Sequence, residues 1–452
     1  MLPSPDSIRI LSLVIPIGLF TCGLIRRPLY AVLGYFCLVY FKTSAYFPAV
    51  AKMQGELIFA GATLVIIFLH RAPLEKLAPG YNPVNKYLYL FSGCVALSYL
   101  VAMDQEWSWF YAVYHYIKVI ILYIMVLLTV NDGRDFKILT WGLVLIFVYM
   151  TYEPLYGYLY GIGGNEQGYG TVYTSDMGIL SGHVALANNM NQMIPIALFL
   201  LISQTKKSLK VVAFLALLTF LVSLIASQSR GGFVGFVAIA GLLVYYFRDN
   251  KKMLAFAVPG IIAVFLLSAT LIYTASRISS GTIEGRLIGL AHGIEMVRIK
   301  YHFLGVGPGC FQKARSMYFG YTMDSHNLYG ELIGELGIPG TIMWTLLIWN
   351  IYKNLKLVRE REKSGRNSKV DQYLFYLSTG YMISLLVRLF IGLGSHGLYF
   401  FYWYIMGAIS IACVKISEHD VVEEDVEEQK SLQIYPRGRR GIRKYDGYRK
   451  FN

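Results

Sequence analysis

Residues Lys210 to Phe247 read KVVAFLALLTFLVSLIASQSRGGFVGFVAIAGLLVYYF. Two apolar runs, 210–226 and 231–247, flank one short polar segment whose single cation is Arg230. An α-helix needs about 20 predominantly apolar residues to cross the hydrocarbon core of a bilayer. Because each run approaches that length and has an uncharged interior, this stretch predicts two membrane-spanning helices joined by a tight turn at one membrane surface.

The composition of the whole chain agrees with this stretch. Of its 452 residues, 56% are hydrophobic and only 15% are charged, whereas soluble domains are about 25% charged. So few polar residues cannot cover a globular surface, and the apolar content also excludes disordered and disulfide-scaffold proteins. We therefore expect an all-α polytopic integral membrane protein.

Thirteen ranges are candidate membrane spans, and we expect about 12–13 transmembrane helices. The ranges are 8–25, 28–50, 55–70, 87–103, 109–130, 136–157, 182–204, 210–226, 231–247, 253–274, 334–352, 372–393 and 396–416. They divide the chain into an N-terminal transmembrane bundle (1–274), a large, partly helical loop (275–333), C-terminal transmembrane helices (334–416) and a charged tail (417–452).

The cations predict the orientation of these spans. The net charge is +14, from 41 Lys+Arg against 27 Asp+Glu, which in a soluble protein would suggest a nucleic-acid partner. Here most cations fall in one set of alternate loops and only nine of the 41 in the opposite set. Cation-rich loops are typical of the cytoplasmic side. We therefore expect a cytoplasmic C-terminus, a large loop on the outer side, and no nucleic-acid partner.

Arginines on the cation-poor side are candidates for anion binding. Arg230 opens a span, and Arg286 lies in the large loop. A guanidinium can contact phosphate oxygens through two parallel hydrogen bonds. The alternative is that both side chains lie at the membrane interface with their guanidinium groups in water. Arg388 falls inside a predicted span, where a charge is costly and is a functional candidate.

The segment from Asp324 to Gly337 predicts the start of a helix. Asp324 or Ser325 would cap it and place His326 in the first turn. The positive helix end would keep His326 neutral and able to accept a proton. Gly330 and Gly334 would allow another helix or a ligand to approach closely. Alternatively, His326 is an interfacial histidine that only bonds to a neighbour.

Other polar groups give weaker indications. The span 182–204 contains five polar residues that must either line a cavity or bond to other helices; they are His183, Asn188, Asn189, Asn191 and Gln192. Asp104 and Glu106 could hold a metal, but a lone pair of this kind is more often solvated. Lys118 lies within a span. With no cluster of histidines and cysteines, we expect neither a metal nor a cofactor.

Three motifs follow one another in a fixed order. They are Ser229-Arg230-Gly231-Gly232, Gly305-Val306-Gly307-Pro308-Gly309, and His326-Asn327-Leu328-Tyr329 continuing to Glu335-Leu336-Gly337-Ile338-Pro339-Gly340. With the polytopic layout, this order resembles the bacterial O-antigen ligase and polysaccharide polymerase superfamily. The resemblance covers 229–340 by motif and most of the chain by layout. It implies a GT-C-like architecture and catalytic roles for Arg230, Arg286 and His326.

The resemblance also implies an activity and a location. The protein would be a metal-independent, inverting glycosyltransferase of the bacterial inner membrane that uses a polyprenyl-diphosphate-linked glycan as donor. The acceptor would be a periplasmic hydroxyl, on lipid A-core for a ligase or on another glycan for a polymerase. We expect further substrate contacts from Arg388, Asn327, Tyr329, Arg298 and Asn191.

Two alternatives stay open. A protein O-oligosaccharyltransferase belongs to the same superfamily, but no distinct protein-docking domain is visible in the sequence. A transporter or flippase would use the polar span 182–204 with Lys118 and Arg388 as a pathway. Against it, the sequence shows no paired inverted halves.

Overall fold

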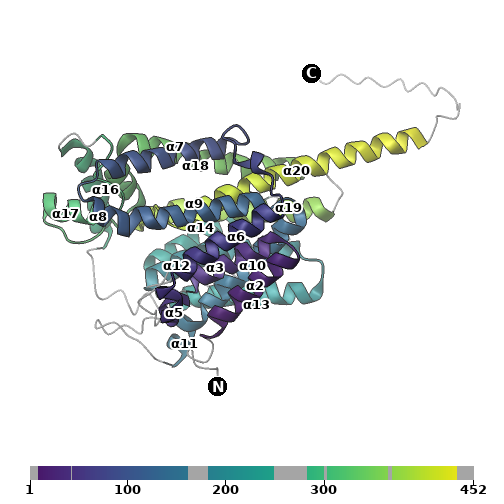
Figure 1. Cartoon of the computed structure of the whole chain (residues 1–452), viewed down its shortest axis with the longest axis horizontal. Coiled ribbons are helices and arrows are strands. Elements are labelled where there is room, and N and C mark those ends of the chain that lie inside the picture. The colour runs from purple at the N-terminus through teal and green to yellow at the C-terminus, as the bar shows by residue number, and fades with distance from the viewer. Residues whose placement is uncertain are drawn as a thin grey trace.

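The computed structural model describes residues 9–41, 43–160, 182–248, 282–299, 303–364 and 369–434. These residues form helices and turns, with no β-strand among them (Figure 1), so the all-α prediction is confirmed. The helices are α2 (Leu11–Ile25), α3 (Pro28–Tyr40), α4 (Thr43–Tyr46), α5 (Pro48–Lys52), α6 (Gly55–Leu69), η1 (Leu74–Leu77), α7 (Pro83–Leu100), α8 (Gln105–Ser108), η2 (Trp109–Val113), α9 (Tyr114–Thr129), α10 (Gly133–Met150), α11 (Tyr152–Tyr160), α12 (His183–Ser203), α13 (Lys207–Ala226), α14 (Arg230–Phe247), α16 (Thr282–Arg298), α17 (Phe311–Phe319), α18 (Leu328–Ser364), α19 (Lys369–Ile391), η5 (Gly392–Gly394) and α20 (Phe401–Ile434).

The helices bear out a polytopic membrane protein. Among the described residues, seven helices are long and apolar enough to cross a membrane, and α2, α3 and α6 are shorter apolar helices. Helices α7 and α20 coincide with two further predicted spans. The predicted span 253–274 lies outside the described residues, so the total of 12–13 spans stays a prediction.

Long helices run side by side along the molecule (Figure 1). Helix α18 is central, because it contacts α7, α16, α19 and α20. Helix α12 packs against α13, α14 and α19. We call the end formed by residues 98–113, 303–328 and 392–400 the site end, and the end formed by residues 26–28, 71–83, 127–135 and 415–418 the opposite end. Each end joins loops that the cation count assigns to one side of the membrane.

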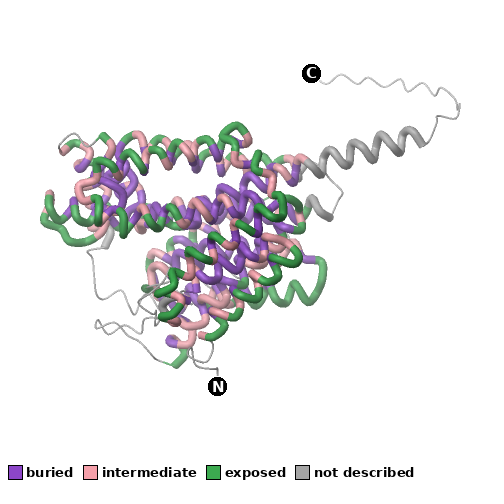
Figure 2. The backbone as a smooth tube through the Cα atoms, viewed as in Figure 1, coloured by how far each residue is buried: buried purple, intermediate pink, exposed green. Residues whose placement is uncertain are grey.

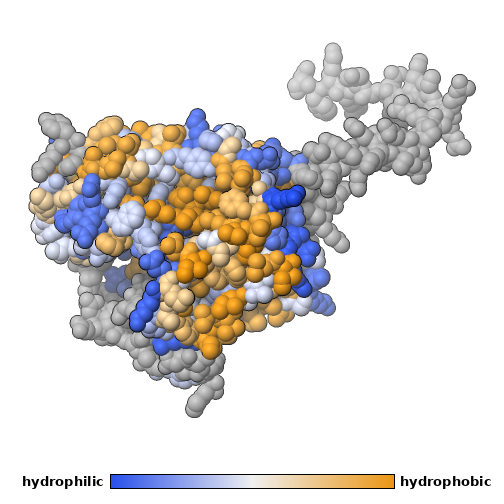
Figure 3. Space-filling view, in the orientation of Figure 1, coloured by the Kyte–Doolittle hydropathy of each residue, from blue (hydrophilic) through white to orange (hydrophobic). Residues whose placement is uncertain are grey.

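Burial follows the contrast between a protein core and a lipid-facing surface. Helix α12 is the most enclosed of the candidate spans (Figure 2). Large apolar side chains instead remain exposed on α13, among them Val211, Phe214 and Leu215. Hydrophobic side chains also cover much of the surface seen in Figure 3. Such a surface is compatible with lipid, because apolar side chains that contact hydrocarbon avoid the unfavourable exposure to water.

Four predicted boundaries differ from the structure. The range 28–50 is not one helix, because α3 ends at Tyr40 and Pro48, which lacks a backbone donor, opens a separate short helix. Residues 396–400 precede α20 and are not helical, since Gly397 has a φ of 124°. The expected division at 333/334 falls inside α18, and that at 416/417 falls inside α20.

A kink in α18 explains why the third motif has a glycine at position 337. Gly337 has φ 62° and ψ −160° within this helix, a conformation that favours glycine. The kink frees the carbonyls of Gly334 and Glu335, which accept hydrogen bonds from Val306 N (2.9 Å) and Gly307 N (3.1 Å). The second and third sequence motifs are therefore paired through their backbones.

Candidate active site

The start of α18 differs from the predicted one. The helix begins at Leu328, and its cap is Asn327, whose Oδ1 accepts from Tyr329 N and Gly330 N at 3.0 Å each. Ser325 is not the cap, because its Oγ bonds to the Asn327 backbone. His326 therefore precedes the helix, with a φ of 46°. It projects at the surface of the site end instead of lying in the first turn.

Glycines bring α16 against the start of α18. A Cβ atom on Gly289 would lie 2.0 Å from the Ser325 carbonyl oxygen, and one on Gly330 would lie 2.6 Å from the Gly289 carbonyl oxygen. Only glycine permits backbones to approach this closely. The predicted close approach at Gly330 is confirmed, and the partner is a helix. Helix α16 carries Arg286, so this packing brings Arg286 to the segment that holds His326.

Arg286 lies between two other parts of the site end. A Cβ atom on Gly394 would be 2.9 Å from its Nη1, and one on Gly231 would be 3.9 Å from its Nη2. The guanidinium thus reaches both the loop after α19 and the segment that begins at Arg230. Among the described residues it has no hydrogen bond or ion pair, so its donors are available to an anion.

The Ser229-Arg230-Gly231-Gly232 motif forms the capped start of α14. Ser229 Oγ accepts from Gly232 N at 3.2 Å, which satisfies one of the free donors at the helix start. Asn191 Nδ2 on α12 donates to the Gly232 carbonyl at 2.7 Å, while Asn191 Oδ1 is buried without a partner in the described part of the chain. Asn191 therefore lies directly behind the segment that presents Arg230.

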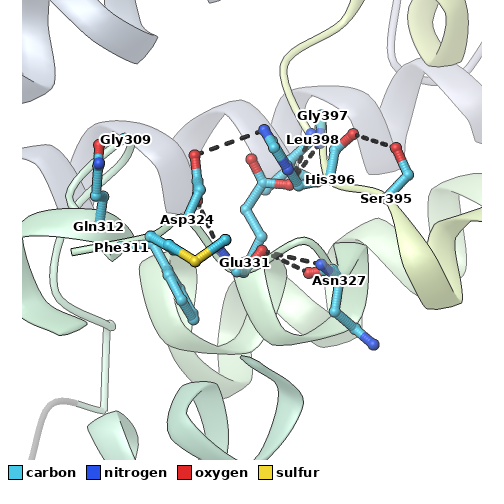
Figure 4. A network of polar contacts seen from close by, with 12 residues as sticks. Gly309, Phe311, Gln312, Asp324, Asn327, Glu331, Ser395, His396, Gly397 and Leu398 are labelled. Carbon is cyan, nitrogen blue, oxygen red and sulfur yellow. Dashed lines mark hydrogen bonds and ion pairs between the residues drawn. The ribbon is translucent and has the colours of Figure 1, made fainter. Parts of the chain in front are cut away.

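The loop 392–398, which we call the histidine loop, is fixed from several directions (Figure 4). Glu331 Oε2 accepts from Gly397 N (2.8 Å) and Leu398 N (3.0 Å). Asn327 Nδ2 donates to the Leu393 carbonyl at 2.9 Å, and Asn188 Nδ2 donates to Ser395 Oγ at 2.9 Å. These bonds from α12 and α18 hold the loop in one conformation.

Glu335 fixes a second loop of the site end. Its Oε2 accepts from Gly309 N and from the Tyr399 hydroxyl, both at 2.8 Å, and its Oε1 accepts from Phe311 N at 3.2 Å. The residue is buried, with 2% of its surface exposed. One carboxylate thus joins the glycine-rich turn 305–309, the start of α17 and the chain that enters α20.

Arg388 is buried beneath the histidine loop. It is 3% exposed, and its Nε has no hydrogen-bond partner among the described residues. The faces of Phe400 and Trp403 lie 5.8 and 5.7 Å from its Cζ. A Cβ atom on Gly397 would be 3.2 Å from Arg388 Nη2. Arg388 is therefore a buried cation directly below the loop that Arg286 touches from above.

His326 has an altered proton affinity. Although the residue is exposed, the surrounding protein partly desolvates the imidazole and so lowers its pKa below the ordinary 6.5, and the neighbouring His396 lowers it further. Arg286 and Arg315 act in the same direction, whereas Asp324 opposes them. The result is a neutral imidazole near pH 7, as the sequence predicted, although burial and neighbouring cations are the causes, not the first turn of a helix.

Three residues of the site end were missed as functional candidates by sequence reasoning. His396 lies with its ring 5.3 Å from that of His326. Arg315 is buried and its Nη1 donates to the Met323 (3.2 Å) and Asp324 (2.8 Å) carbonyls. Its Nε donates to His292 Nδ1 at 3.0 Å, and burial and Arg315 lower the pKa of His292. In the sequence, only the Gly-Ser-His-Gly composition of 394–397 could have indicated the histidine loop.

Other predicted residues have different surroundings. Tyr329 donates its hydroxyl to the Leu389 carbonyl at 2.9 Å and so joins α18 to α19. Arg298 lies at the far end of α16 and pairs with Glu295 at 3.0 Å. Lys118 pairs with Glu56 at 2.8 Å, and Asp104 caps α8 and pairs with Lys313. Among the described residues, no group of three histidine, cysteine, aspartate or glutamate side chains could hold a metal.

The polar residues of α12 bond to their surroundings. Asn188 and Asn191 reach the histidine loop and α14, while Asn189 and Gln192 donate to carbonyls of their own helix at 2.8 and 3.1 Å. Of the two possibilities that the sequence left open, bonding to other parts of the protein accounts for Asn188 and Asn191.

Comparison with known proteins gives a match to one part of the chain. Residues 214–345 match a family model described as O-antigen ligase, and this range contains Arg230, Arg286 and His326. The histidine loop and Arg388 lie beyond it. A search of curated proteins gave no match. Residues 214–345 are therefore similar to the O-antigen ligase family, which supports the resemblance to the O-antigen ligase and polysaccharide polymerase superfamily.

Proposed function

We propose that this protein transfers a glycan from a polyprenyl-diphosphate carrier to a hydroxyl acceptor, with inversion and without a metal. The observation that carries this proposal is the meeting of Arg286 with the His326 segment, through glycine packing of α16 on α18. A guanidinium that has no partner among the described residues lies close enough to the imidazole to influence its proton affinity. The pair matches the two needs of glycosyl transfer from a diphosphate.

The first need is to stabilise the leaving group. When the anomeric carbon–oxygen bond breaks, its electron pair moves onto a diphosphate oxygen, and fixed cations stabilise that charge most when it develops. Arg286 and Arg230 are placed to bind the diphosphate from the site end. Arg388 supports the same charge from below, because its buried Nε has no partner in the described chain. A buried guanidinium in this state favours an anionic ligand.

The second need is to remove the acceptor proton. His326 is exposed at the site end and neutral near pH 7, so it can accept the hydroxyl proton while the acceptor oxygen attacks the anomeric carbon. Asn327 and Tyr329 hold the backbone beside it, and Asn191 holds the Arg230 segment. Arg298 is far along α16 and would contact only a distant part of the glycan.

We further propose that the site end faces the periplasm, that the protein lies in the bacterial inner membrane, and that its C-terminus is cytoplasmic. The sorting of cations between alternate loops supports this orientation. A large glycan also needs an open face, whereas the lipid tail of the donor needs a helix surface exposed to the bilayer. The acceptor is lipid A-core or a second glycan, and a protein acceptor is the alternative.

The decisive experiment uses the purified protein in vesicles with a polyprenyl-diphosphate-linked glycan. Release of polyprenyl diphosphate is measured with lipid A-core, a glycan or a protein as acceptor. We expect the wild type to release it with one of the first two, and His326→Ala to abolish release while folding normally. The matched control is His70→Ala, which removes an exposed histidine beside the Ile66 carbonyl, far from the site end.

The same experiment tests the transporter alternative. Movement of the glycan lipid across the vesicle without release of polyprenyl diphosphate would overturn the proposal. The structure weakens that alternative at Lys118, which is paired with Glu56 and therefore does not present a free charge to a pathway.

A further inference from the structure

We propose that His396, paired with Asp324, is the group that receives the acceptor proton from His326. The inference rests on the proposed function and extends it to a two-histidine relay. Neither His396 nor a role for Asp324 in proton transfer follows from the sequence motifs that define the family match, because residue 396 lies outside residues 214–345.

The position of His396 is set by more bonds than a surface loop needs. Besides the bonds from Glu331, Asn327 and Asn188, Trp403 Nε1 donates to the Gly397 carbonyl at 3.1 Å and the Tyr404 hydroxyl donates to the Leu398 carbonyl at 2.9 Å. Five side chains from three helices thus fix seven residues. A group fixed in this way loses little entropy when it takes part in a reaction.

The two ring nitrogens of His396 differ, because one lies near Asp324 and the other has no hydrogen-bond partner among the described residues. Its Nε2 lies 3.5 Å from Asp324 Oδ2, as Figure 4 shows. Its Nδ1 is buried without a hydrogen-bond partner in the described chain. The ring centroid is 5.3 Å from that of His326, a separation that a proton can cross directly or through one water molecule. Asp324 would hold the ring and stabilise the imidazolium once it forms, as a carboxylate does for a histidine base.

The proton balance of the relay is complete. The acceptor oxygen forms its bond to the anomeric carbon, and the carbon–oxygen bond to the diphosphate breaks with its electron pair on the leaving oxygen. The hydroxyl proton passes to His326 and then to His396, and it leaves to water after the product departs. Asp324 remains ionised throughout. His326 is thereby neutral again for the next acceptor.

The charges around His326 predict opposite pH shifts for the removal of Asp324 and the removal of His396. Besides Asp324 and His326, the charged groups that lie against the histidine loop on either side of His396 are Glu331 on α18 and Arg388 on α19, both beside Gly397, and Arg286 on α16, beside Gly394. Asp324 raises the pKa of His326, whereas His396 lowers it. Removing the carboxylate must therefore move the acidic limb of activity to lower pH, and removing the second histidine must move it to higher pH.

The test compares pH profiles of polyprenyl diphosphate release for the wild type, His396→Gln and Asp324→Asn. We expect both variants to lose on the order of 10-fold in rate at pH 7, with the acidic limb shifted up in His396→Gln and down in Asp324→Asn. Asp324→Glu should restore both rate and limb. Asp104→Asn is the matched control, because it removes a site-end aspartate paired with Lys313 and should leave the limb in place.

A purely structural role would lower the rate without moving the limb, and this result would overturn the relay. Unchanged rates would overturn it as well. If His396→Gln fails to fold, Asp324→Asn and Asp324→Glu still decide the question, because a limb that stays in place in both contradicts the assignment. No release by the wild type with any acceptor would instead contradict the proposed function.

Discussion

The two ends of the helix bundle use charge in different ways. At the opposite end, Arg27 pairs with both Asp132, at 3.2 Å, and Asp135. The Lys76 ammonium donates to the Leu127 and Val130 carbonyls and to Asn131 Oδ1, at 3.2, 2.9 and 2.7 Å. Each of these cations is held by acceptors of the protein itself, so this end uses its charge to join loops.

At the site end Lys313 pairs with Asp104, but the buried carboxylates and the two arginines Arg286 and Arg388 are not matched with each other. Glu331 and Glu335 give their oxygens mainly to backbone N–H groups, while Arg286 and Arg388 have no hydrogen bond or ion pair in the described residues. Carboxylates used as loop anchors leave the guanidiniums available. The cations without a partner among the described residues, not the cations as such, are therefore the ones that we propose to bind the anionic substrate.

Among the variants that test this comparison of the two ends, the largest effect is expected for Arg286→Gln. Losing one fixed group that stabilises developing charge costs about 10²–10³-fold in rate, and stability should not change because this side chain bonds to nothing in the described protein. Single-turnover release of polyprenyl diphosphate measures the effect. The mirror variant is Arg27→Gln, which should keep the rate and lose about 1 kcal/mol of stability. A rate for Arg286→Gln within threefold of the wild type would contradict the comparison.

Glu335→Gln should show the next largest effect, on stability. The carboxylate accepts from Gly309 N, Phe311 N and the Tyr399 hydroxyl, and a Gln amide would turn a donor toward one of them. An unmatched buried polar contact costs about 1–3 kcal/mol, so the melting temperature in detergent should fall by several degrees. Glu106→Gln, on an exposed side chain of α8, is the control and should melt like the wild type. Equal melting of both variants would show that Glu335 is no anchor.

Arg388→Met should separate stability from binding. Replacing a buried charge by an apolar side chain of similar length is often neutral or stabilising, and Met would pack against Phe400 and Trp403. We expect an unchanged or higher melting temperature together with donor binding weakened about 10-fold, or about 1.4 kcal/mol. The measurement is the apparent KM for the glycan lipid beside a thermal melt. A large fall in melting temperature with unchanged KM would mean that Arg388 serves the fold instead.

The sequence predicted the helices better than it predicted the surroundings of the proposed site residues. Spans follow from composition, since lipid requires long apolar helices, and most predicted spans in the described chain coincide with an apolar helix, although the range 28–50 is interrupted after Tyr40. Arg286 and His326 became candidates because few cations and one helix start stand out on the cation-poor side. Their convergence depends on Gly289 and Gly330, whose contact is a tertiary property that spacing along one helix only suggests.

The histidine loop shows why the rest could not be predicted. Residues 392–398 are mostly apolar or glycine, and they lie between two apolar segments, so all but residues 394 and 395 were assigned to the two predicted spans 372–393 and 396–416. Their conformation is imposed by Glu331 and Asn327, which lie more than 60 residues earlier in the chain. For the same reason, the sequence did not indicate His396 as a candidate. Local periodicity carries no information about a partner so distant in sequence.

The smallest effect is a pH dependence confined to the site end. Because burial and His396 lower the pKa of His326 below 6.5, the neutral, proton-accepting form persists throughout the range above that value. The rate should therefore be flat from pH 8 to pH 7 and fall only as the pH drops through the lowered pKa of His326, where it is halved. The free energy of unfolding should also fall with pH. The unfolded chain takes up this proton more readily, so the folded state loses stability as the pH falls below 6.5. Arg27→Gln, whose change lies at the opposite end, should leave this acidic limb in place. A rate that already halves above pH 7 would mean that His326 titrates above its ordinary value and is not the proton acceptor.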